Sequence, residues 1–92
     1  MAVEVRIPTI LRPLTGGEKV VEGAGATLDE LILDLEVRHP GLRAKVVEND
    51  ELRRFINVYL NDEDVRFMGG LTAPVAEGDK VTILPAVAGG AS

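Results

Sequence analysis

The sequence has 92 residues, 46% of them hydrophobic, which is enough for one small domain with a single core. Its net charge of -5 argues against nucleic acid as the main partner, because binding phosphates requires a basic surface. It has no cysteine, which excludes a disulfide framework, a cysteine-ligated zinc site and a thiol nucleophile, and which is compatible with a cytoplasmic protein.

The sequence gives no sign of a targeting signal or a membrane span. Residues 1–6 lack a basic region followed by a long apolar one. No apolar run approaches the roughly 20 residues that a membrane-spanning helix needs. We therefore expect neither a signal peptide nor a membrane partner.

The first elements form a hairpin. Residues 3–7 alternate between apolar and polar side chains, which predicts a half-buried strand that ends at Pro8. Residues 8–17 contain two prolines and a Gly-Gly pair, which indicates a turn-rich connection. A second strand is predicted at residues 19–21.

A helix follows, and its start is marked by a capping box. Thr27 can accept from the Glu30 amide, and the Glu30 side chain can reach back to the Thr27 amide. Apolar residues recur on one face at helical spacing: Leu28, Leu31, Ile32 and Leu35. The helix should end near His39, because Pro40 disfavours helix in the residue before it and Gly41 suits a left-handed exit.

The second half of the chain predicts three more strands. Residues 43–54 are mostly irregular, with room for a short helical turn. Residues 56–60 alternate as a strand, Asn61-Asp62 opens a turn, and residues 65–67 form a short return strand. Residues 80–84 alternate as the final strand after a turn at residues 77–79.

This order of elements predicts an α+β fold of the β-grasp (ubiquitin-like) type. We expect a mixed sheet of four to five strands with one main helix packed on one face. The final strand should lie beside the first, with Val81 and Ile83 facing the helix. Residues 1–84 would form the domain, and residues 85–92 a flexible tail that carries Gly89-Gly90.

The tail is the best candidate for a functional site. Val87, Ala88, Gly89 and Gly90 are small enough to enter a narrow crevice, since glycine lets backbone pass where side chains would clash. An α-carboxylate is ionised at neutral pH and is a poor acyl donor. Attack on the α-phosphorus of ATP would convert it to an anhydride with AMP, which a sulfur nucleophile opens to a thiocarboxylate. The alternative is a frayed terminus without function.

Two residues follow Gly90, and they place the free carboxylate on Ser92. The chemistry above needs it on Gly90. A protease that cleaves between Gly90 and Ala91 would resolve this, and we favour that explanation. Ala91-Ser92 could instead have been added during cloning, or the interpretation of the tail could be wrong.

A docking surface is predicted on the sheet face opposite the helix. The alternation places Tyr59, Thr82 and Leu84 there, beside the root of the tail. The alternatives are ordinary exposed residues, or cover by the segment from Pro8 to Gly17. No nucleophile, metal-ligand spacing or catalytic constellation is recognisable, so we expect no catalytic residue, no metal and no bound cofactor. The chain looks like a carrier or substrate for enzymes rather than an enzyme.

Residues 7–13, 61–67 and 81–90 resemble the MoaD/ThiS family of ubiquitin-like sulfur carriers, and the first two stretches favour its cysteine-biosynthetic branch. The resemblance implies that an E1-like adenylyltransferase acts on Gly90 and that a thiocarboxylate forms there. It further implies a PLP-dependent cysteine synthase that uses O-phosphoserine, and a JAMM-type zinc metalloprotease that releases the cysteine. ATP and PLP would belong to these partners in the cytoplasm.

Other functions fit the same residues. The chain could be the small subunit of molybdopterin synthase or a thiazole sulfur carrier. It could also be a protein modifier that forms isopeptide bonds through Gly90, or an inert β-grasp interaction module.

Overall fold

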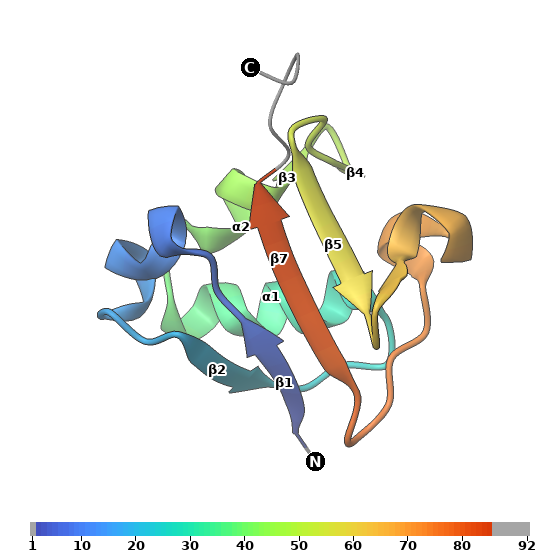
Figure 1. Cartoon of the computed structure of the whole chain (residues 1–92), viewed down its shortest axis with the longest axis horizontal. Coiled ribbons are helices and arrows are strands. Elements are labelled where there is room, and N and C mark those ends of the chain that lie inside the picture. The colour runs from blue at the N-terminus through green and yellow to red at the C-terminus, as the bar shows by residue number, and fades with distance from the viewer. Residues whose placement is uncertain (1, 86–92) are drawn as a thin grey trace.

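A computed structural model describes residues 2–85 of the chain (Figure 1). Within these residues the chain forms seven strands, two α-helices and three short 3-10 helices. In chain order they are β1 (Val3–Arg6), η1 (Thr9–Thr15), β2 (Val20–Gly23), α1 (Leu28–Arg38), α2 (Leu42–Val46), β3 (Val47–Glu48), β4 (Glu51–Leu52), β5 (Ile56–Leu60), β6 (Glu63–Asp64), η2 (Val65–Met68), η3 (Gly70–Thr72) and β7 (Lys80–Pro85).

Five strands form one mixed sheet in the order β2-β1-β7-β5-β6. The final strand lies in the middle, parallel to β1 and antiparallel to β5, and α1 crosses behind it (Figure 1). This is the predicted β-grasp arrangement, with the last strand beside the first. β3 and β4 form a separate two-stranded ribbon.

The core lies between the sheet and α1. The predicted helix stripe is buried, with Leu31 fully inaccessible, and Val81 and Ile83 of β7 are 1% and 2% exposed within the same cluster. Burying large aliphatic side chains contributes about 1.5–3 kcal/mol each. The alternation seen in the sequence therefore identifies the inner face of the sheet correctly.

The ends of α1 are fixed by side chains. Thr27 Oγ1 accepts from the Glu30 amide at 3.2 Å, as predicted, but the Glu30 carboxylate accepts from the amide of Ala26 and not from that of Thr27. At the other end Gly41 is left-handed, with φ of 96°. The Glu36 carboxylate accepts from the amides of Gly41 and Arg43, and these bonds lower its pKa.

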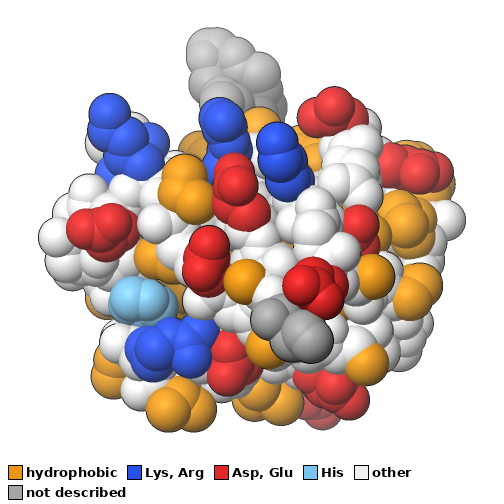
Figure 2. Space-filling model, turned by 90° about the horizontal axis from the view of Figure 1, so that it is seen from below, with side chains coloured by type: hydrophobic (Ala, Val, Ile, Leu, Met, Phe, Trp, Pro, Cys, Tyr) orange, Lys and Arg blue, Asp and Glu red, His pale blue; other side chains and the backbone are white. Residues whose placement is uncertain are grey.

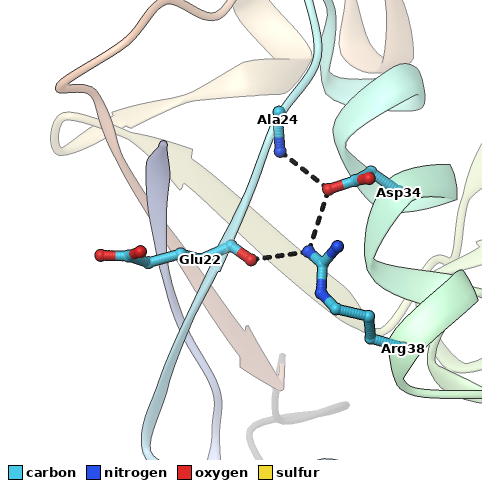
Figure 3. Close-up of polar contacts among 4 residues, drawn as sticks. All are labelled: Glu22, Ala24, Asp34 and Arg38. Carbon is cyan, nitrogen blue, oxygen red and sulfur yellow. Dashed lines mark hydrogen bonds and ion pairs between the residues drawn. The ribbon is translucent and has the colours of Figure 1, made fainter. Parts of the chain in front are cut away.

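One polar network ties α1 to strand β2 (Figure 3). Asp34 Oδ2 accepts from Arg38 Nη2 and from the Ala24 amide, both at 2.9 Å, and Arg38 Nη2 also donates to the Glu22 carbonyl. The hydrogen bond from Arg38, followed by that from Ala24, holds the pKa of Asp34 below its ordinary value. The network fixes the edge strand against the helix.

The return strand predicted at residues 65–67 is wrong. The return strand is β6, and Val65–Met68 forms the 3-10 helix η2. Asp64 caps this helix by accepting from the Arg66 amide at 2.9 Å, and Gly69 ends it with φ of 100°. Val65 is therefore buried while Phe67 is 85% exposed, whereas a strand would have put both on one face.

Two segments described as turn-rich or irregular have more order than the sequence predicts. Residues 8–17 contain η1, and residues 43–54 contain most of α2 and the β3–β4 ribbon. Asn49 and Asp50 both have positive φ, which closes the ribbon with a two-residue turn. The second strand begins at Val20 and continues to Gly23, two residues beyond its predicted end.

Candidate functional site

The described chain ends at the root of the predicted tail. Strand β7 runs to Pro85, one residue beyond the predicted domain boundary, and Pro85 lies opposite Ile56 of β5. The predicted tail and processing residues lie outside the described residues: Val87, Ala88, Gly89, Gly90 and Ala91. The structure therefore describes the strand that precedes the tail, and the tail chemistry stays a prediction.

The three predicted docking residues share the outer face of the sheet, opposite α1. Tyr59 lies directly across from Thr82 in the β5–β7 register, and both are half-buried. Leu84 lies two residues further along β7 and is 44% exposed, so the segment from Pro8 to Gly17 does not cover it. The geometry leaves this face accessible beside the root of the tail.

The start of β7 is held by a side-chain network. Asn61 Oδ1 accepts from the Lys80 amide at 3.0 Å, and Asn61 Nδ2 donates to Asp79 Oδ1 at 3.1 Å. The other Asp79 carboxylate oxygen accepts from the Ala76 amide. Asn61 and Asp62 both have positive φ, in a tight turn between β5 and β6. The bonds from Asn61 and Asp79 fix the direction in which β7 leaves the turn at residues 76–79.

The other end of β7 is held indirectly by Arg66. Its guanidinium donates to the Asn57 side chain and to the backbone carbonyls of Arg53 and Ile56. Since Ile56 pairs with Pro85, Arg66 braces the strand against which the tail begins. Arg66 was predicted to lie on a strand, and this role was not predicted, because its acceptors lie nine or more residues away in the chain.

At the lower end of the molecule, acidic and basic side chains are intermixed (Figure 2). In residues 2–85 no group of three His, Asp or Glu side chains is placed to hold a metal ion. Within the same range, no helix has the length and apolar character needed to cross a bilayer.

Comparisons with known proteins agree with this geometry. Residues 5–90 match the ThiS family. The "Sulfur carrier protein CysO" of Mycobacterium tuberculosis is 55% identical over 93 aligned residues, covering 98% of this chain and all of the relative. One chain in the crystal structure of the Amycolatopsis orientalis BexX/CysO complex superposes with a TM-score of 0.92 at 65% identity, covering 96% of this chain and 99% of that one. The small archaeal modifier protein SAMP1 of Haloferax volcanii has a TM-score of 0.78 at 28% identity, covering 97% and 99%.

Proposed function

Because this chain belongs to the ThiS family, we propose that it is a sulfur carrier for cysteine biosynthesis, active as a thiocarboxylate on Gly90. The observation that carries this proposal is the similarity to CysO over nearly the whole chain, together with the small-residue ending at Gly89-Gly90. The chain is accordingly a carrier on which enzymes act, and not itself an enzyme.

The body of the protein would aim the tail. β7 is the central strand of the sheet, and both of its ends are braced by the Asn61 and Arg66 contacts. An extended backbone from Leu84 to Gly90 spans about 20 Å, which suffices to enter an active site while the outer sheet face stays outside. Tyr59, Thr82 and Leu84 would then form the docking surface.

The chemistry would begin once Ala91-Ser92 has been removed. The Gly90 carboxylate attacks the α-phosphorus of ATP on an E1-like adenylyltransferase, and pyrophosphate leaves. A sulfur nucleophile then displaces AMP from the acyl adenylate and leaves the thiocarboxylate. Activation is needed because an ionised carboxylate resists nucleophilic attack.

Sulfur would next pass to a three-carbon acceptor. A PLP-dependent cysteine synthase would supply this acceptor from O-phosphoserine with loss of phosphate, and the thiocarboxylate sulfur would add to its terminal carbon to form the new carbon–sulfur bond. The acyl group then shifts from sulfur to nitrogen, which leaves cysteine joined to Gly90 through a peptide bond. A JAMM-type zinc metalloprotease would release it, and the same kind of enzyme could remove Ala91-Ser92 beforehand. ATP, PLP and zinc would be bound by the partner enzymes and not by this chain, and we expect the cycle to run in the cytoplasm.

Reconstitution tests the proposal. A chain ending at Gly90 is incubated with an E1-like enzyme, ATP and sulfide, and its intact mass should rise by the difference between a sulfur and an oxygen atom. Addition of O-phosphoserine and the synthase should then convert it to a cysteine adduct. A matched chain ending at Gly89 should keep its melting temperature but form neither product.

Two results would favour other members of this fold class. Thiocarboxylate without any cysteine adduct would indicate a carrier for another acceptor, such as molybdopterin or thiazole precursors. A ladder of covalent conjugates through lysine would favour the modifier function, to which the likeness with SAMP1 points. No mass change under any condition would contradict the carrier proposal.

A further inference from the structure

A groove of about 510 Å³ opens beside the root of the tail, between η1 and strands β2 and β7. Three exposed aliphatic side chains line it: Ile10, Val20 and Leu84, which are 64%, 39% and 44% exposed. They are three of the seven large hydrophobic side chains that stay exposed in residues 2–85. Exposed apolar side chains that cluster in this way indicate an interaction site, whereas single scattered ones do not.

The charges on this groove have the opposite sign to the protein as a whole. Arg6, Arg12 and Lys19 line it and no acidic residue does, although the chain carries a net charge of -5. Neither Arg6 nor Lys19 forms an ion pair with a carboxylate in the described part of the chain. The groove therefore combines an apolar floor with cations that remain available to a ligand.

Arg12 is oriented for such a ligand. Its Nε donates to the Ile7 carbonyl at 3.1 Å, which fixes the plane of the guanidinium. Its two terminal nitrogens make no hydrogen bond to residues 2–85. A guanidinium held in this way can bind a carboxylate with two parallel hydrogen bonds, and less side-chain entropy is lost because the fork is already positioned.

We propose that this groove binds a short segment of a partner protein in which apolar side chains alternate with Asp or Glu. The apolar side chains would cover Ile10 and Leu84, and the carboxylates would meet Arg12 and Lys19. The inference rests on the proposed function, since the groove adjoins the point from which the tail would enter that partner's active site. An acidic partner segment also suits an otherwise acidic protein, because charge attraction is then confined to one place and sets the docking orientation.

Synthetic peptides provide the test, with no enzyme, ATP or sulfide present. We expect a seven-residue peptide of alternating Leu and Glu to bind the full chain saturably in calorimetry, and more weakly as salt is raised. Peptides of Leu and Lys, or of Ser and Glu, should bind at least about tenfold more weakly. Amide shifts in NMR titrations should cluster at residues 6–12, 19–20 and 82–85.

Paired substitutions assign the binding to the groove. Ile10→Ser should weaken the Leu–Glu peptide about tenfold, and Arg12→Gln about fivefold. Lys19→Gln, which breaks no hydrogen bond within the described chain, should weaken it at least about twofold. The matched controls are Val37→Ser on α1 and Lys45→Gln on α2, both exposed and outside the groove, which should leave affinity within about twofold.

Several outcomes would overturn the proposal. These are no saturable binding, equal binding of all three peptides, or shifts centred on another surface. If deleting residues 86–92 shifts the groove amides and strengthens peptide binding, the occupant is the chain's own tail. If groove amides shift with protein concentration alone, the occupant is a second copy. Because the peptides need no sulfur chemistry, failure here is distinct from failure of the Gly90 proposal.

Discussion

The inner and outer faces of the central sheet are built by the same strands, but the inner face is buried against α1 and the outer face is partly exposed. Along β7, Val81 and Ile83 lie beneath α1 and are at most 2% exposed, whereas Leu84 on the outer face is 44% exposed. The inner face therefore sets the free energy of unfolding, and the outer face is available to partners. This separation allows the contact surface to vary in sequence with little effect on the stability of the fold.

The largest expected effect comes from the inner face. Leu31→Ala removes a side chain that is fully buried against the sheet, and it should lower the free energy of unfolding by about 3 kcal/mol. The matched control is Leu33→Ala on the same helix, where the side chain is 46% exposed and the loss should be below about 1 kcal/mol. Urea denaturation measures both, and similar losses would show that the two faces of α1 do not differ as described.

The outer face should respond in binding and not in stability. Leu84→Ser should weaken the complex with an E1-like enzyme about tenfold, or about 1.4 kcal/mol, because an exposed apolar contact is lost there. The free energy of unfolding should change by no more than about 0.5 kcal/mol. Leu33→Ser, exposed on the opposite side of the molecule, serves as the control in titration calorimetry. Equal affinity of the two variants would argue against docking through this face.

The cap at the start of α1 should contribute a smaller amount to the free energy of unfolding. Thr27→Ala removes the hydroxyl that accepts from the Glu30 amide, and it should cost about 1 kcal/mol of stability. Thr27→Ser keeps an acceptor at the same place and should restore most of that loss. If Ser and Ala are equally destabilising, the capping bond does not account for the effect.

The smallest effect concerns the link between α1 and β2. Because the pKa of Asp34 is lowered in the folded protein, its contribution to stability is present above the unfolded value of 3.8 and is lost as pH falls through the folded value. Asp34→Asn should therefore lower stability by less than about 1 kcal/mol near neutral pH, since the pair with Arg38 is partly exposed. The difference between the two proteins should shrink in denaturation curves recorded below pH 3.8. A constant difference would exclude the carboxylate as its source.

The sequence predicts the parts of the fold whose signals are local. The Thr27 cap, the apolar stripe of α1 and the alternation of β5 and β7 each lie within a few residues, and all three predictions are confirmed. The segment Val65 to Phe67 alternates like a strand, but it folds as the 3-10 helix η2, which Asp64 caps at its start and Gly69 ends. The sheet contacts of Arg66 are equally hidden, because they depend on where β5 lies in space.

In the candidate site, too, the parts with local signals were predicted and the parts formed by distant segments were not. Tyr59, Thr82 and Leu84 are placed on the outer face by strand alternation alone, and the structure confirms that position. The groove beside them was not predicted, since its walls come from three segments that only the folded chain brings together. Gly89 and Gly90 were predicted from their size and place in the sequence, and they stay predictions.

The most direct test is the intact mass of the protein isolated from the cells that naturally make it, after growth without added cysteine. We predict a chain that ends at Gly90, with a fraction carrying one sulfur in place of one oxygen. A protein that always retains Ser92 and never gains sulfur would contradict the assignment of this chain as a carrier.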